Sequence, residues 1–304
     1  MRLWPYLAER AFFLSTSRSG AGETIFYYDS PPCIGVSHGE TSAPVFVLIH
    51  GLGDEADSWR HLIPFLNARG FRVLAVDLPG FGRSVTKKRI NIKNHVSAVL
   101  KLIEAAVSGA RVFLAGNSMG AMVAESAAFQ RPDLVKGLVL IDGNIPGGPS
   151  NPGLLALAKL LLRRKWYRSY QGNPEGAWAS LYPYYADLDS MPPGDKEFLK
   201  QRVMDRVESS TQEKAFFATQ RSLVWTYMSR SSAFAQKVKD YKGKILLLWG
   251  EMDRLIPLSS AEVFKALRDD IRLELIPGAG HLPQQEKPEE TARRMADFAD
   301  GAIG

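Results

Sequence analysis

A serine flanked by glycines is the strongest chemical signal in the sequence. Ser118 lies in Gly116-Asn117-Ser118-Met119-Gly120, which follows an apolar run at 111–115 and precedes an alanine-rich run. This is the G-x-S-x-G pattern of a nucleophile elbow, a sharp turn from strand to helix that lifts the serine hydroxyl above a sheet. The glycines are expected because side chains there would collide with the neighbouring strand and helix. We therefore predict that Ser118 is a nucleophile.

A serine hydroxyl becomes an effective nucleophile only when a base removes its proton. We assign this role to His281, one of five histidines, because the loop Gly278-Ala-Gly280-His281 follows the last apolar run and can carry the ring over the sheet's carboxyl edge. His50 ends an earlier run, and we expect it to hold the neighbouring loop. The remaining three precede the serine in segments that look exposed; they are His38, His61 and His95.

The imidazole needs a carboxylate that fixes its tautomer and stabilises its cation. Asp253 fits because it comes just after the apolar run at 245–249. That places it at the carboxyl end of a predicted strand, where α/β sheets carry their sites. Asp142 ends the preceding predicted strand and stays open as an alternative, and Glu251 is a weaker one.

The negative oxygen of an acyl-transfer intermediate needs hydrogen-bond donors. We expect one to be the backbone N–H of Met119, at the helix start. The other is expected from the N–H of Leu52, in the loop His50-Gly51-Leu52-Gly53-Asp54. The Gly-x-Gly of this loop lacks the third glycine and the acidic partner of a dinucleotide site. The sequence has no Walker loop, zinc spacing or haem motif, so we predict no cofactor and no metal.

Short apolar runs are the elements that must position these residues. They are rich in Val, Ile and Leu and do not alternate, which is typical of parallel strands covered on both faces. Helical patterns lie between them, so we predict an α/β fold with a doubly wound, mostly parallel sheet. Residues 24–28 are expected to add an antiparallel edge strand. The other predicted strands are 45–49, 72–76, 111–115, 138–141, 245–249 and 271–276, and the predicted helices are 59–69, 92–107, 119–130 and 259–268.

The alternation of strands and helices breaks between residues 144 and 243. This segment has helical patterns, many aromatic residues and no strand-like run. We therefore predict a helical cap, 144–243, on a core made of 1–143 and 244–304. The segment carries 15 Lys plus Arg and nine Asp plus Glu, which accounts for the whole net charge of +6. We expect the cap to enclose an apolar acyl pocket; whether its charge selects anionic substrates stays open.

Length and composition are those of a folded globular protein, with 304 residues, 45% apolar and 23% charged. Pro5, Glu9 and Arg10 interrupt the N-terminal apolar run before signal-peptide length, and no stretch approaches the length of a membrane-spanning helix. We expect a cytoplasmic protein. We expect no nucleic-acid binding, because Lys87-Lys88-Arg89 has no aromatic stacking motif beside it. Peripheral lipid contact through the cap, at the leucine-rich residues 154–162, or through the N-terminus stays open.

Together these motifs resemble the capped α/β-hydrolase superfamily. The likeness covers 45–142 and 245–300, about half of the chain, with its motifs in order. It is carried by His50 to Asp54, Asp77-Leu-Pro-Gly80-Phe-Gly82-Arg-Ser84, Gly116 to Gly120, Gly250 to Pro257, and Gly280-His281-Leu-Pro with Glu286-Lys-Pro288-Glu289. The resemblance implies an α/β-hydrolase fold with a helical cap inserted after the sixth strand. It also implies that Asp77 and Ser84 shape the loop beneath the site. The cap matches no motif of the family.

Within that superfamily the serine narrows the reaction, because relatives that hydrolyse haloalkanes or epoxides carry aspartate in the elbow. We predict a serine hydrolase that cleaves a carboxylic ester or related acyl bond of an apolar small molecule, like an esterase or lipase. Carbon–carbon hydrolases of ring-cleavage products often share Gly-Asn-Ser-Met-Gly. They usually have tryptophan after the histidine, where this chain has Leu282. That reaction stays an alternative, and so does a ligand receptor on the same fold.

Overall fold

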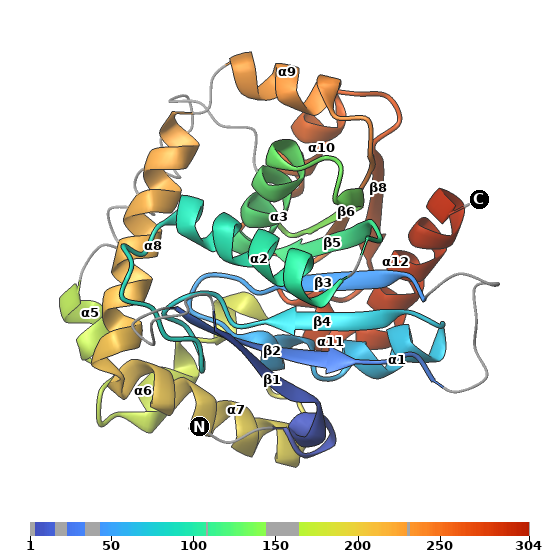
Figure 1. The fold of residues 1–304 in the computed structure, drawn as a ribbon. Helices are drawn as coiled ribbons and strands as arrows, with labels where there is room; N and C mark the ends of the chain where they lie inside the picture. Colours follow the sequence, from blue (N-terminus) through green and yellow to red (C-terminus); the bar gives the residue numbers. More distant parts are fainter. Residues whose placement is uncertain are drawn as a thin grey trace.

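One mixed sheet forms the centre of the molecule. The computed structural model describes residues 4–15, 23–33, 43–107, 109–143, 164–229 and 232–303. Its eight strands are ordered β1-β2-β4-β3-β5-β6-β7-β8, and β3 to β8 run parallel. The predicted doubly wound, mostly parallel sheet is confirmed (Figure 1). The strands are β1 (Ala11–Ser15), β2 (Thr24–Ser30), β3 (Val45–Ile49), β4 (Arg72–Val76), β5 (Val112–Asn117), β6 (Val135–Ile141), β7 (Lys244–Gly250) and β8 (Arg272–Ile276).

The antiparallel end of the sheet differs from the prediction. β2 is antiparallel to β4, as expected for residues 24–28, but it is not the edge strand. β1 pairs with its other side, with Phe13 opposite Phe26. Since Phe12 and Phe13 are adjacent and both exposed, β1 shows neither the continuous burial nor the alternation from which strands are inferred.

Helices cover both faces of the sheet, which explains why its strands do not alternate in sequence. In β3, Val45, Val47 and Ile49 pack in the cluster that includes helices α2 (Ile92–Ala106), α3 (Met119–Gln130) and α10 (Leu258–Lys265). Phe46 and Leu48 point to the other face, which carries α1 (Leu62–Ala68) and α12 (Pro288–Ile303). All five side chains are buried, as parallel strands require.

Between β6 and β7 the described part of the chain is helical. Figure 1 shows helices α5 to α8 gathered on one side of the sheet. These helices are α5 (Arg164–Arg168), α6 (Pro174–Ala179), α7 (Pro193–Glu208) and α8 (Ser210–Met228), with a 3-10 turn at Tyr182–Tyr184. Most of their buried apolar side chains form a separate cluster, which Leu282 of the core joins, whereas Ala215 and Tyr227 of α8 pack in the core cluster. The leucine-rich segment 154–162 lies outside the described residues.

Two further segments join the layers. Helix α9 (Ser232–Asp240) packs on the core, where Phe234 contacts Phe129 and Phe264. Near the N-terminus, Leu7 is buried, and the ring of Trp4 meets Phe198 of α7 edge-on at 4.9 Å. No helix in the described ranges combines the length and apolar character needed to cross a membrane.

Candidate active site

Ser118 occupies the turn between β5 and α3, with φ 54° and ψ −117°. Such a positive φ is rare for a residue with a side chain. The turn is held because the Ser118 N–H donates to the Ile141 carbonyl at 2.8 Å. A Cβ on Gly116 would collide with the Gly120 backbone, and one on Gly120 would collide with the Ile49 carbonyl. The flanking glycines are therefore required by close backbone packing, as predicted.

His281 and Asp253 form a buried pair at the carboxyl ends of β8 and β7. His281 Nδ1 lies 2.9 Å from Asp253 Oδ2. The other carboxylate oxygen accepts the N–H groups of Leu255 at 2.7 Å and Ile256 at 3.1 Å. Because Nδ1 faces a carboxylate, it carries the ring proton, which leaves Nε2 free to accept one.

The two alternative acids are placed differently. Asp142 is fully buried at the end of β6, and its Oδ1 accepts the Gly250 N–H at 2.8 Å. Glu251 is exposed, and its carboxylate accepts the Gly278 N–H at 3.3 Å. Neither makes a hydrogen bond with the His281 ring within the described part of the chain, so Asp253 is the carboxylate that contacts the histidine.

The loop that carries His281 is anchored from three directions. The backbone N–H of His281 donates to the carbonyl of Tyr184 in the cap at 2.8 Å. The amide of Asn117 donates to the His281 carbonyl at 3.0 Å. Glu286 accepts the N–H groups of Gly280 at 2.7 Å and Ala186 at 2.6 Å, and burial raises the pKa of its carboxyl group. The anchoring roles of Asn117 and Glu286 were not predicted from the sequence, although both are polar residues inside motifs that resemble the family.

A cavity of about 320 Å³ lies between the core and the cap, and both Ser118 and His281 line it. Its volume is within the range of small-molecule sites. The predicted oxyanion residues Leu52 and Met119 also line it, and a Cβ built on Gly51 would lie 3.5 Å from Ser118 Cβ. The Ser118 hydroxyl makes no hydrogen bond with any described residue. Most of the cap side is aromatic or aliphatic, with Trp166, Tyr167, Tyr170, Leu181, Tyr184, Tyr185, Leu199, Val203, Val207, Phe216, Leu223, Val224, Tyr227 and Met228.

Arg206 of α7 is a cation on the wall of this largely apolar cavity. One of its guanidinium nitrogens donates to the carbonyl of Gly53, next to Leu52. The cap thus holds the loop that is predicted to supply an oxyanion donor. Arg206 could not be recognised from the sequence, because nothing in its sequence context distinguishes it from the other basic residues of the cap.

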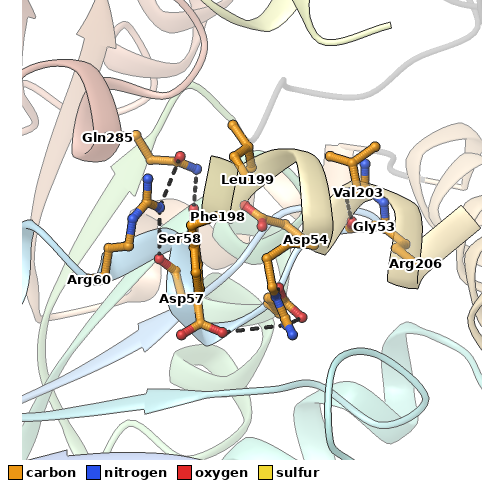
Figure 2. Close-up of a pocket in the computed structure, with 12 residues that line it drawn as sticks. Gly53, Asp54, Asp57, Ser58, Arg60, Phe198, Leu199, Val203, Arg206 and Gln285 are labelled. Atoms are coloured by element: carbon orange, nitrogen blue, oxygen red, sulfur yellow. Dashed lines mark hydrogen bonds and ion pairs between the residues drawn. The ribbon is translucent and has the colours of Figure 1, made fainter. Parts of the chain in front are cut away.

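Figure 2 shows how helix α7 is fixed to the loop after β3. Arg202 pairs with Glu55 and lies 3.4 Å from Asp57. Arg60 pairs with Asp195 at 3.1 Å. Apart from Asp195, these side chains line a small pocket of about 20 Å³, and the ion pairs fix the register of the cap on the core.

The other described histidines are structural. His50 accepts the Leu78 N–H at 3.0 Å through Nε2, while its Nδ1 lies 2.7 Å from the Gly51 carbonyl, so it holds the loop as predicted. His61 is half-buried and pairs with Asp195. The prediction that His95 is exposed was wrong. Its ring is fully buried 2.9 Å from Thr219 of α8, and burial lowers its pKa to about 3.

The loop beneath the site is shaped by Asp77 and Ser84, as the resemblance implied. Asp77 accepts the Ala56 N–H at 2.7 Å and pairs with Arg83 at 2.7 Å. The Ser84 hydroxyl donates to the Asp77 carbonyl at 2.6 Å and accepts the Phe26 N–H at 2.8 Å.

Among the described residues, the acidic and histidine side chains close enough to share a metal ion are Asp142, Asp253 and His281, with donor atoms within 4.8 Å of one another. The hydrogen bond between Asp253 and His281 already uses two of these three groups with each other.

Comparison with known proteins shows the family to which this fold belongs. A family model described as alpha/beta hydrolase fold matches residues 44–288. The chain is 28% identical to a pimeloyl-(acyl-carrier protein) methyl ester esterase of Edwardsiella ictaluri, over 84% of this chain and 93% of that protein. It is also 28% identical to a 2-hydroxy-6-oxononadienedioate/2-hydroxy-6-oxononatrienedioate hydrolase of Paraburkholderia phymatum, over 86% and 90% of the two chains. Epoxide hydrolases are among its other relatives.

A solved structure extends the similarity to the whole fold. The chain superposes on the crystal structure of a membrane phospholipase A with a TM-score of 0.74 and 27% identity, over 97% of this chain and 87% of the other. The matched family model covers the elbow, the Asp253 turn and the His281 loop. This chain therefore belongs to the alpha/beta hydrolase fold family.

Proposed function

We propose that this protein is a serine hydrolase that cleaves a carboxylic ester or related acyl bond, with Ser118 as nucleophile, His281 as general base and Asp253 as its orienting carboxylate. One observation carries the proposal. Ser118, held at a positive φ, and His281, whose ring is joined to Asp253 at 2.9 Å, lie on the wall of the same cavity.

The chemistry follows from the protonation of these groups. Ser118 Oγ attacks the acyl carbon while His281 Nε2 takes its proton, and Asp253 stabilises the resulting imidazolium. The N–H groups of Leu52 and Met119 stabilise the negative oxygen of the tetrahedral intermediate. The imidazolium then gives its proton to the departing alcohol as the intermediate collapses. The acyl group remains bound to Ser118 as an ester. Water repeats the sequence: its proton passes to His281, and the collapse of the second intermediate returns a proton to Ser118 and frees the acid.

An apolar acyl substrate fits the cavity best. Its lining is mostly aromatic and aliphatic, so a bound acyl chain would leave water and gain about 0.8 kcal/mol for each buried methylene. The relative that acts on a methyl ester and the phospholipase A both support acyl-bond cleavage. The serine at position 118 argues against an epoxide substrate, despite the epoxide hydrolase relatives.

Carbon–carbon bond hydrolysis is the second candidate. It is favoured by Asn117 and Met119 on either side of the nucleophile and by the relative that acts on a nonadienedioate. Against it stands Leu282, which follows His281 and packs into the apolar cluster of the cap.

A fluorophosphonate probe tests the nucleophile, because only an activated hydroxyl attacks it. We expect labelling at Ser118. In the Ser118→Ala variant we expect no labelling and a loss of turnover on the order of 10⁴–10⁶. Ser180 lines the same cavity, and its hydroxyl donates a hydrogen bond to the Ala177 carbonyl. Ser180→Ala is therefore a matched control that should keep both the labelling and the turnover of wild type. Full activity in Ser118→Ala would refute the proposal.

A substrate panel separates the candidate reactions. It contains aryl esters of graded chain length, a lactone and a ring-cleavage dienoate. Ester turnover far above background supports the proposed function. Preferential turnover of the dienoate supports the carbon–carbon reaction. Single turnover with a thermal shift, and no sustained hydrolysis, indicates a ligand receptor on this fold.

A further inference from the structure

A second buried carboxyl group lies behind the Asp253–His281 pair. Asp142 follows the last residue of β6 and is fully buried. Its backbone has φ 43°, a left-handed conformation that aspartate tolerates better than most residues. The proposed reaction assigns this group no role, and a buried carboxyl group without one is costly to keep.

The two carboxyl groups have different hydrogen-bond partners. Both Asp253 oxygens accept N–H donors, one from His281 and the other from Leu255 and Ile256. Asp142 accepts a single N–H, that of Gly250, through Oδ1. Its Oδ2 is buried and has no hydrogen-bond partner among the described residues. A carboxylate oxygen left in this way is unsatisfied, whereas a protonated one is a donor.

Electrostatics decides which of the two carries a proton. Donor atoms of Asp142, Asp253 and His281 lie within 4.8 Å of one another, and two buried carboxylates so close cannot both be charged without strong repulsion. Asp253 receives three N–H donors, so the charge is better stabilised there. Burial, and then the charge of Asp253, raise the pKa of Asp142 well above its usual range, and Glu286 raises it further.

We propose that Asp142 is a positioning residue, whose protonated carboxyl group donates a hydrogen bond from Oδ2 to the carboxylate of Asp253. A carboxyl–carboxylate pair, rather than a single carboxylate, then faces His281. The donated hydrogen bond fixes the orientation of Asp253 and withdraws part of its charge from the imidazole. The proton stays on Asp142 throughout the reaction. This role rests on the proposed function, in which His281 is the general base.

Two substitutions test whether position 142 needs a hydrogen-bond donor or a charged carboxylate. In Asp142→Asn, the amide can donate to Asp253 and accept from Gly250, so both hydrogen bonds survive. We expect its kcat/KM to stay within about threefold of wild type, with the acid limb of the pH profile unmoved. In Asp142→Leu the donor is lost. We expect kcat/KM to fall roughly 10- to 100-fold, the usual effect of losing a hydrogen bond to a charged group.

The pH profile distinguishes positioning from a general loss of structure. Without the donor, Asp253 keeps its full charge and stabilises the protonated imidazole more strongly. His281 then loses its proton at higher pH, so the acid limb of kcat/KM in Asp142→Leu should move to higher pH. The charged and titratable groups facing Asp142 are Asp253, His281 and Glu286, and all three are retained in both variants. A merely structural defect would lower kcat/KM and leave the limb in place.

Infrared difference spectroscopy tests the proton directly and needs no activity. Wild type minus Asp142→Asn at neutral pH should show the C=O stretch of a neutral carboxyl group. The proposal is overturned if carboxylate bands appear instead, or if Asp142→Asn loses about 10⁴ in turnover as expected for Asp253→Asn. It is also overturned if Asp142→Leu keeps the activity and acid limb of wild type. If Asp142→Leu does not fold, the Asn variant and its spectrum still decide. Failure of the fluorophosphonate to label Ser118 would refute the proposed function alone.

Discussion

Ser118 combines a strained backbone with a half-buried position on the cavity wall, where a substrate can reach its hydroxyl. Backbone conformations such as its φ of 54° cost about 1–3 kcal/mol and persist only where the surrounding structure enforces them. Here the Ile141 carbonyl on one side and the close approach of Gly116 to Gly120 on the other enforce it. The hydroxyl is thereby presented to the cavity rather than packed into the helix.

Asp253 is expected to act through the tautomer of His281. In Asp253→Asn the amide can still bond the ring, but as a donor it favours the wrong tautomer, so turnover should fall by roughly 10⁴ while the fold is kept. Steady-state kinetics and thermal unfolding measured together check this. The comparison is with Asp142→Asn, since an equal loss there and none here would move the orienting acid to the end of β6.

The elbow joins strand β5 to helix α3 and brings the start of α3 against strand β3. Gly120 sits so close to β3 that its Cα faces the Ile49 carbonyl with no room for a methyl group. The loop after β3 and the proposed nucleophile are thus fixed relative to each other by backbone contact, and glycine at position 120 is a structural requirement.

Substitution of Gly120 tests this packing. In Gly120→Ala the added Cβ would force β3 and α3 apart, so we expect a loss of stability of about 1–3 kcal/mol, typical of overpacking, and weaker labelling of Ser118. The matched control is Gly194→Ala in the first turn of α7, where an added Cβ meets nothing within 4 Å. It should keep the wild-type melting temperature or raise it slightly. Equal melting temperatures for the two variants would contradict this account.

The contact between α2 and α8 predicts how stability depends on pH. His95 of α2 is buried against Thr219, and its pKa is lowered to about 3. The unfolded state therefore binds a proton below about pH 6.5 that the folded state does not. The stability from neutral His95 is fully present above that pH and is lost progressively as pH falls toward 3. His50 adds an effect of the same sign, because burial lowers its pKa as well.

Replacing His95 measures its contribution to the pH dependence of the free energy of unfolding. Between pH 8 and pH 5 the free energy of unfolding should fall by about 2 kcal/mol less in His95→Gln than in wild type. The reason is that one proton, bound only by the unfolded state, contributes about 1.4 kcal/mol per pH unit below the unfolded pKa. Urea unfolding at the two pH values measures this. The same acid-induced loss in both proteins would show that His95 can be protonated in the folded state.

For the whole molecule, the cap supplies much of the cavity wall and contacts the loops of the candidate site. Buried ion pairs attach α7 to the core, Arg206 holds the carbonyl of Gly53, and Tyr184 holds the His281 loop. The cap therefore lines the cavity and also positions two loops of the candidate site. Exclusion of water from such a cavity strengthens the oxyanion donors.

A largely apolar cavity predicts a preference for acyl chain length. Across aryl esters from acetate to laurate, kcat/KM should rise several-fold per carbon until the cavity is full, because each methylene contributes about 0.8 kcal/mol. Leu223→Trp narrows the cavity and should shorten the preferred chain, whereas Val263→Trp, exposed on α10 and away from the lining, should not.

Varying the salt concentration distinguishes selection by the apolar lining from selection by the positive charge of the cap, since exposed charges are screened at physiological ionic strength. Length preference should survive at high salt. A steep salt dependence without length preference would mean that the positive charge of the cap selects the substrate instead.

The sequence by itself determined the parallel part of the sheet, the elbow and the order of Ser118, Asp253 and His281. The glycines of the elbow are dictated by local backbone packing, and residues that follow parallel strands must meet at one edge of the sheet. Only the tertiary structure decided between Asp253 and Asp142. Both end neighbouring strands, and a choice between them depends on which carboxylate meets the ring nitrogen in space. The burial of His95, the outer position of β1 and the place of Arg206 on the cavity wall were decided in the same way. Each depends on contacts between residues that lie far apart in the chain, which periodicity and motif spacing do not encode.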